Sequence, residues 1–170
     1  MDLPQPGDPT VPSFARLSLV LLLLAGCATA PAGAPAASPT QALRPDLAAQ
    51  WRDASGAIVW PSHDGFAATP VLLVLPPGVL IDRFGSDYGR FFSPKGAAYK
   101  ARALPYVCAS LVYRVYKTDQ PLLVWTGTAA PWFDQPGGAT QLETDATAAQ
   151  LLADHVIEPV ADPTAMPCDR

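Results

Sequence analysis

The sequence of 170 residues contains few of the side chains on which hydrolytic and metal-dependent enzymes usually rely. It has two histidines, three cysteines and no Cys-x-x-Cys pair, so no zinc or other metal site is predicted. Charged residues make up only 15% of the chain, and its net charge of −4 argues against general nucleic-acid binding, which needs a basic face. We find no convincing pair of catalytic carboxylates and no Ser-His-Asp arrangement. These absences argue against an ordinary hydrolase.

Long hydrophobic runs are also missing. The apolar run at residues 17–26 is too short to span a bilayer as a helix and is typical of a signal peptide. It ends in Leu-Ala-Gly before Cys27, which resembles the lipobox of bacterial lipoproteins, where the cysteine is lipidated and becomes the mature N-terminus. We therefore expect residues 1–26 to be a lipoprotein signal peptide, and Cys27 to anchor the protein outside the cytoplasm, at the outer membrane if the cell has one. The alternative is cleavage nearby, which leaves Cys27 free.

The rest of the chain divides into a tether and one domain. Residues 27–45 are rich in alanine and proline with almost no charge, which predicts an extended linker. Residues 46–170 are long enough for a single hydrophobic core. Outside the cytoplasm the two remaining cysteines, Cys108 and Cys168, tend to pair, and a bridge closing a loop of 61 residues would stabilise the fold by roughly 4 kcal/mol.

Short strands dominate the predicted domain. Apolar or alternating segments predict strands at 69–75, 79–84, 111–117 and 121–127, and a short strand that ends near Gln141. Short helices are predicted at 46–52 and 97–103. A longer helix, capped by Thr144 or Asp145, would place five residues on one face: Ala148, Leu151, Leu152, His155 and Val156. From residue 158 onward we expect a tail on the surface. The predicted fold class is α+β, a single compact domain of short antiparallel strands with peripheral helices.

The segment 82–94 concentrates side chains suited to ligand binding, with two arginines, four aromatic residues and two glycines. Arginine holds phosphate oxygens in pairs, and aromatic faces stack on nucleobases or pyridine rings. Of Phe91 and Phe92, which are adjacent, one should face the core and the other a cleft. The alternative is an ordinary β-hairpin whose arginines are solvated or paired with Asp82 or Asp87.

Four segments, in this order, resemble the TNT domain, a family of NAD(P)+ glycohydrolases named after the tuberculosis necrotizing toxin. They are Trp60-Pro61 with Asp64-Gly65-Phe66; Ile81 to Gly85 continued by Gly89 to Pro94; Tyr99 with Arg102 to Pro105; and Pro131 to Phe133 with Gln135 to Gly138 and Gln141. The resemblance spans residues 60–158, nearly all of the predicted domain. Each motif is weak alone, but four in order are fairly specific.

The resemblance implies cleavage of the nicotinamide–ribose bond of NAD+ or NADP+ as substrate, without a cofactor. Arg83 and Arg102 match arginines that would bind the diphosphate, and Gln141 matches the glutamine that would position the ribose or the attacking water. Four further residues are candidates for substrate binding: Phe84, Phe91, Arg90 and Trp132. A toxin of this kind would need an immunity protein as partner if it met the producer's own NAD+.

Two positions depart from the toxin: Phe91 stands where it has tyrosine, and Arg114 where it has histidine. They keep open the alternative of a catalytically inactive envelope lipoprotein that binds a nucleotide or a protein. A third reading is ADP-ribosyl transfer to a protein, for which Glu143 is a weak candidate that we expect to face solvent.

Overall fold

The computed structural model describes residues 41–161 and residue 168, all within one compact unit of residues 36–170. The predicted signal peptide, Cys27 and most of the predicted tether lie outside the described residues. The last residues of that tether pack on the domain, because the Arg44 amide donates to the Pro105 carbonyl and the Ala42 amide donates to the Ser110 hydroxyl. The fold therefore begins earlier than the expected boundary at Asp46.

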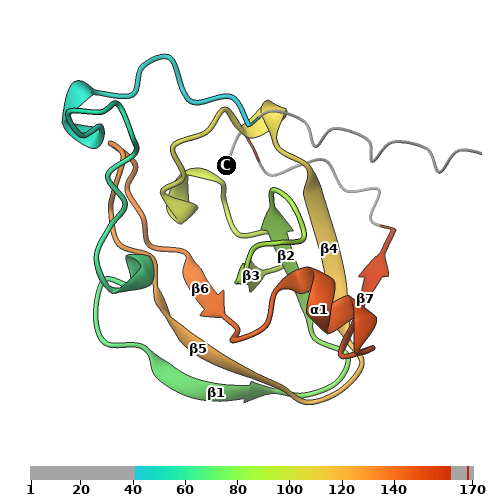
Figure 1. The fold of residues 1–170 in the computed structure, drawn as a ribbon. Helices are drawn as coiled ribbons and strands as arrows, with labels where there is room; N and C mark the ends of the chain where they lie inside the picture. Colours follow the sequence, from blue (N-terminus) through green and yellow to red (C-terminus); the bar gives the residue numbers. More distant parts are fainter. Residues whose placement is uncertain (1–40, 162–167, 169–170) are drawn as a thin grey trace, which may run out of the picture. The chain divides into compact units, whose positions relative to one another are not determined.

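The domain is built on one antiparallel sheet of seven strands in the order β1-β5-β6-β3-β2-β4-β7 (Figure 1). The strands are β1 (Val71–Leu75), β2 (Leu80–Phe84), β3 (Phe91–Pro94), β4 (Tyr113–Thr118), β5 (Leu122–Thr128), β6 (Thr140–Glu143) and β7 (Ile157–Val160). β2 and β3 form a hairpin in which Asp82 opposes Ser93. β1 and β2 follow one another in the chain but do not pair, because β1 lies at the sheet edge beside β5.

One face of the sheet carries the main core. Ile81, Phe92, Tyr116 and Leu142 come from four strands and pack there with Leu151 of α1 (Ala148–Ala153). Thr147 begins this helix with a capping box: its hydroxyl accepts from the Gln150 amide, and the Gln150 side chain accepts from the Thr147 amide. The helix so anchored covers this face.

A smaller core lies on the opposite face, because neighbouring residues of a strand point to opposite sides. Phe84 packs there with Tyr99 and Leu111. The segments above this face hold four 3₁₀ turns: η1 (Ala49–Trp51), η2 (His63–Gly65), η3 (Lys100–Arg102) and η4 (Cys108–Ser110). In Figure 1 these connections arch over the strands, and those around η2 and η3 form part of the roof of the site described below.

The edge strand β1 is exposed along most of its length. Val71, Leu72, Leu73 and Val74 are all exposed, and only Leu75 is buried. Leu72 pairs with Trp125 of β5, and both are exposed on the same face. Within the described part of the chain, none of the helices has the length and apolarity needed to cross a membrane.

The sequence predictions for strands are largely confirmed. Five predicted strands are present with bounds shifted by at most two residues. β3 was expected only in the alternative of a hairpin at residues 82–94, and β7 was not predicted as a strand. Helices are fewer and shorter than expected: the segments 46–52 and 97–103 contain only three-residue 3₁₀ turns, and α1 is capped by Thr147 and ends before His155. The domain is therefore mostly β rather than α+β.

Candidate active site

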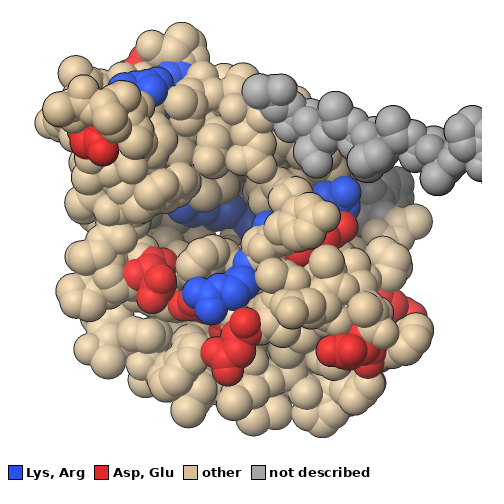
Figure 2. Space-filling view, in the orientation of Figure 1, with Lys and Arg blue, Asp and Glu red and all other residues tan. Residues whose placement is uncertain are grey.

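A cavity of about 590 Å³ lies between the sheet and the connections above it. Its floor is formed by β2, β3 and β6, and its roof by the segments around η2, η3 and residues 129–133. Figure 2 shows the hollow with basic side chains at its floor and acidic ones beside its mouth. Arg83 and Arg102 are the two basic residues among those that line it. The volume is in the range of sites for small organic ligands.

Arg83 on β2 is the most unusual residue of the cavity. It is only 6% exposed, and its guanidinium lies 5.5 Å from the centre of the Phe92 ring. Nη1 donates to the Gly89 carbonyl, but Nε is buried without a hydrogen-bond partner. Burial lowers the pKa of Arg83, and no carboxylate within the described residues forms an ion pair with it. A buried cation that lacks a counter-ion is suited to bind an anion.

The loop Gly85–Gly89 holds Arg83 from above. A Cβ added at Gly89 would lie 1.9 Å from Nη2 of Arg83, so only glycine allows this approach. The loop is fixed at both ends: the Gly85 amide donates to the Val112 carbonyl, and the amides of Ala148 and Ala149 donate to the carbonyls of Gly89 and Asp87. The position of the guanidinium is therefore set by the loop.

Arg102 in η3 also lines the cavity, but most of its hydrogen-bonding capacity is used by the protein. Nη2 lies 2.6 Å from Oδ1 of Asp82, and Nε and Nη2 both donate to the Ala97 carbonyl. The guanidinium stacks on Phe84 at 5.0 Å. Asp82 is fully buried and its second oxygen accepts from Tyr113 and from the Gly96 amide. Arg102 thus contributes a fixed and largely neutralised cation.

Gln141 on β6 reaches the cavity from another strand than Arg83. Its Nε2 donates to the Asp64 carbonyl at 2.8 Å, which leaves Oε1 without a hydrogen bond to the described residues. Asp64 and Gly65 in η2 have positive φ, and a Cβ at Gly65 would lie 3.6 Å from Oε1. This turn places the Asp64 carbonyl beside the Gln141 side chain. The bond from Nε2 fixes that side chain, and Oε1 stays available to a ligand.

The aromatic residues divide as the alternation predicted. Phe92 is 3% exposed in the core, whereas Phe91 is 40% exposed and lines the cavity. Phe84 and Trp132 also line it, and the Trp132 indole donates to the Val59 carbonyl. Phe84, predicted to contact the substrate, is mostly buried against Tyr99 and Tyr113.

Arg90 and Glu143 differ from the sequence expectations. Arg90 is not among the residues that line the cavity, and its Nη2 lies 2.7 Å from Oε1 of Glu143. Its predicted role in substrate binding therefore has no support in the geometry. The expectation that Glu143 faces solvent is wrong, because this residue is 7% exposed. Burial, with a smaller effect of Asp64, raises the pKa of Glu143.

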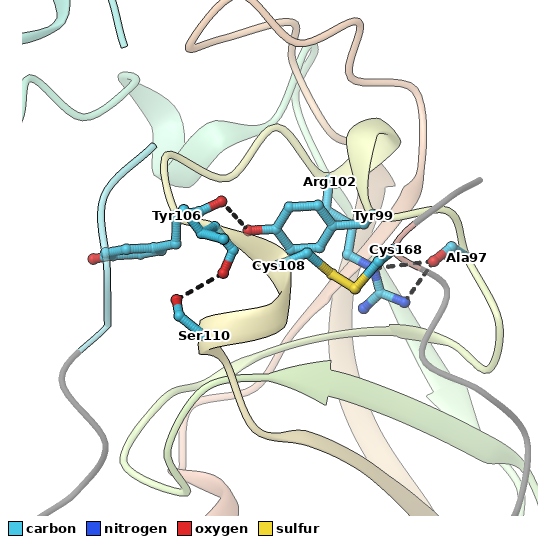
Figure 3. The surroundings of a disulfide bond; sticks show 8 residues. Ala97, Tyr99, Arg102, Tyr106, Cys108, Ser110 and Cys168 are labelled. Carbon is cyan, nitrogen blue, oxygen red and sulfur yellow. Dashed lines mark hydrogen bonds between the residues drawn. A yellow bond between two sulfur atoms is a disulfide. The ribbon is translucent and has the colours of Figure 1, made fainter. Parts of the chain in front are cut away.

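The two cysteines meet in a disulfide beside the cavity roof. Cys108 in η4 is bonded to Cys168, and both pack on the smaller core (Figure 3). Next to them the Tyr99 hydroxyl donates to the Tyr106 carbonyl, and Tyr106 lines the cavity. The disulfide therefore ties the end of the chain to the part of the domain that forms the roof.

Sequence reasoning assigned no site role to three residues of the cavity, although two of them, Trp60 and Asp64, lie in the first family motif. Tyr88 is 80% exposed and Trp60 is 54% exposed, and both line the cavity, as does Asp64. An exposed tyrosine next to Gly89 was visible in the sequence, but its position depends on the fold of the loop. Taken together, the cavity presents an unpaired arginine, a fixed amide and several aromatic faces, which is a set suited to a ligand with both anionic and planar parts.

Comparison with known proteins gives a consistent result. A family model described as tuberculosis necrotizing toxin (TNT) matches residues 74–160. Over 113 residues the chain is 37% identical to a conidial surface nicotinamide adenine dinucleotide glycohydrolase of Aspergillus fumigatus, an alignment that covers 59% of this chain. It covers 48% of the relative, so the chain spans about half of that protein's length.

Among solved structures, tuberculosis necrotizing toxin in complex with its immunity factor is similar in fold. The TM-score is 0.51 at 21% sequence identity, and the match covers 61% of this chain and 63% of that chain.

Proposed function

The chain belongs to the tuberculosis necrotizing toxin (TNT) family, and from this premise we propose that it is an NAD(P)+ glycohydrolase. It would cleave the bond between nicotinamide and ribose and release nicotinamide and ADP-ribose. The relative from Aspergillus fumigatus, which is named as a nicotinamide adenine dinucleotide glycohydrolase, supports this substrate class.

The observation that carries the proposal is the unpaired Arg83 on the cavity wall. A buried guanidinium whose Nε has no hydrogen-bond partner is suited to bind an anion, and the diphosphate of a dinucleotide carries two negative charges. The same cavity contains aromatic faces for the planar rings and the free Oε1 of Gln141 for a hydroxyl or a water molecule. Its volume of about 590 Å³ allows a ligand larger than a single sugar or base.

The chemistry explains why no catalytic acid is needed. The nicotinamide of NAD+ is a cation, so when the C1′–N bond breaks it takes the bonding electrons and leaves as a neutral molecule. The ribose then resembles an oxocarbenium ion, as in other glycosyl transfers. A water oxygen bonds to C1′ and releases one proton to the solvent. The protein has to hold the diphosphate, orient the ribose and admit that water.

We assign the roles as follows. Arg83 binds the diphosphate, and Arg102 contributes to the same field from its fixed position beside Asp82. Gln141 positions the ribose or the water through Oε1, since an amide has no useful basicity. Phe91, which is half exposed at the cavity, stacks on the nicotinamide, with Phe84 and Trp132 behind it as walls.

We further propose that the protein acts outside the cytoplasm, anchored through a lipid on Cys27. The apolar run before that cysteine and the alanine- and proline-rich residues after it support this placement. An enzyme that destroys NAD+ endangers its producer, so an immunity protein is the expected partner. The similar toxin was solved with such a factor.

A second candidate function is nucleotide binding without turnover. One observation favours it, because Asp82 and Ala97 already occupy Nε and Nη2 of Arg102, which leaves Arg83 as the only unpaired guanidinium of the cavity among the described residues. A site with one such cation could hold the dinucleotide and still lack the field that stabilises the transition state.

The deciding experiment follows NAD+ and NADP+ loss and nicotinamide release by the purified, oxidised protein. We expect steady turnover that falls at least a hundredfold in Gln141→Ala, since oriented hydrogen bonds at a reacting centre are worth on the order of 10²–10³ in rate. Gln120→Ala is the matched control, because the Gln120 side chain, within the described residues, bonds only to the carbonyls of residues 154 and 155. Binding without turnover by the folded wild type would support the second function instead.

A further inference from the structure

Arg83 and Arg114 are directly opposite each other on the neighbouring strands β2 and β4. Residues paired in this way lie about 5 Å apart and point to the same face of the sheet. Like charges in such a pair repel, and the charge of Arg114 lowers the pKa of Arg83. The sheet therefore holds two neighbouring cations at a cost in stability, and this cost needs an explanation.

One carboxylate partly offsets the two charges. Oδ1 of Asp87 lies 3.6 Å from Nε of Arg114 and accepts a hydrogen bond from Tyr116. Arg102 is already balanced by Asp82 and adds no net charge. Among the described residues, the cluster of Arg83, Arg114 and Asp87 thus keeps one excess positive charge.

A second cavity of about 240 Å³ opens on the Arg114 side of this cluster. Arg114 is the one charged residue that lines it among the described residues, and the wall is completed by Gln41 and by residues 110–112. Gln41, Gly85 and Ser86 line both cavities, so the two adjoin along the same loop. The volume suffices for a phosphate with several water molecules, each of which needs about 30 Å³.

The guanidinium of Arg114 is suited to receive that phosphate. Nη1 donates to the Gly85 carbonyl at 2.8 Å, which fixes the side chain beside the loop. Nη2 has no hydrogen bond to the described residues, and the side chain is 36% exposed. One nitrogen therefore orients the group, and another is free to bind an oxygen.

We propose that Arg114 binds the 2′-phosphate of NADP+ and makes the enzyme prefer NADP+ over NAD+. The inference rests on the proposed glycohydrolase function and adds to it the substrate that the site selects. With the diphosphate on Arg83, the additional phosphate of the same dinucleotide enters the second cavity. There it neutralises the excess charge of the cluster, which NAD+ leaves in place.

The test compares kcat/KM for NADP+ and NAD+ in the wild type and in Arg114→Gln. We expect the wild type to prefer NADP+ and the variant to lose about tenfold of that preference, mainly through KM for NADP+, because one charge-assisted contact is worth about a factor of ten. Arg114→Lys should restore part of the preference, since it keeps the charge. Arg52→Gln is the control, because Arg52 is exposed and bonds to the Gly56 carbonyl away from both cavities.

A binding measurement on Gln141→Ala separates this inference from the activity. Adenosine 2′-monophosphate should bind more tightly than adenosine 5′-monophosphate or inorganic phosphate, and Arg114→Gln should remove the difference. Equal preference for the two dinucleotides in all variants would overturn the inference while leaving the glycohydrolase function intact. Absence of any turnover or dinucleotide binding by the folded wild type would overturn the proposed function itself.

Discussion

Asp82 and Arg102 form a buried ion pair in which Oδ1 and Nη2 are 2.6 Å apart and the two side chains are 0% and 8% exposed. The pair joins β2 to the roof of the cavity, because Arg102 belongs to η3. The carboxylate also accepts hydrogen bonds from the Tyr113 hydroxyl and the Gly96 amide, so the charge of Asp82 holds several segments of this wall together.

Replacing Asp82 by asparagine should therefore destabilise the domain strongly. Removal of one partner leaves a buried guanidinium without a counter-ion, which costs about 3–5 kcal/mol. The free energy of unfolding from urea titration measures the change. Glu158→Gln is the control, because it breaks an exposed pair with Lys117 and should leave the midpoint almost unchanged. A similar midpoint for Asp82→Asn and the wild type would show that the buried pair is not essential.

Gly89→Ala should impair ligand binding more than folding. The new methyl group would overlap with Nη2 of Arg83 and displace the guanidinium from the cavity wall. We expect dinucleotide affinity to fall at least tenfold, as seen by isothermal titration. Gly56→Ala is the control for a strained backbone away from the site, since Gly56 lies in an exposed turn with a φ of +83° and open space around it. Unchanged affinity in Gly89→Ala would mean that the loop can move without loss of the anion site.

Reduction of the Cys108–Cys168 disulfide should lower stability and loosen the cavity roof. The two cysteines are separated by 60 positions, and closing a loop of this length stabilises the fold by roughly 4 kcal/mol in the chain-entropy model. Thermal unfolding with and without reductant measures the effect, and Cys108→Ser/Cys168→Ser should reproduce the reduced protein and no longer respond to reductant. Equal melting temperatures would show that the smaller core holds this end of the chain without the bond.

Glu143 should make stability depend on pH just above the ordinary range of glutamate. Burial raises its pKa in the folded state above the ordinary value of 4.5, so the unfolded chain releases the proton first as pH rises. The contribution of Glu143 is thus fully present below pH 4.5 and is lost as pH rises through the folded pKa. Unfolding free energies of the wild type and Glu143→Gln, measured between about pH 4 and pH 7, should diverge in favour of the variant. Parallel curves would contradict the raised pKa.

The sequence predicted best what depends on local pattern. Alternation identified β4, and apolar runs with turn signals identified β2 and β5. Alternation also predicted that one of Phe91 and Phe92 faces the core and the other the cavity, as they do. The family motifs predicted Arg83 and Gln141, which come together although they lie on different strands. Strand β7 was missed because Pro159 interrupts it, and proline is accepted there since β7 is at the sheet edge.

What the sequence could not predict depends on contacts distant in the chain. The environment of a charged residue is one example. Arg90 and Glu143 are separated by 53 positions and form an ion pair, so Arg90 is not available to the substrate and Glu143 does not face solvent as expected. The partner of Arg114 across the sheet is another, because only the register of β2 and β4 reveals that two arginines meet. Turns that contain residues with positive φ, as at Asp64, carry no periodic signal.

The contact between Gly89 and Arg83 also limits how the site can change over generations. Every substitution at position 89 adds at least a Cβ, so each single mutation there disturbs the arginine before it introduces any chemistry of its own. The neighbouring Tyr88 is exposed and can be exchanged at little steric cost. Drift in this loop can therefore alter which molecules enter the cavity, whereas the arginine at its base is protected by a residue that has no side chain.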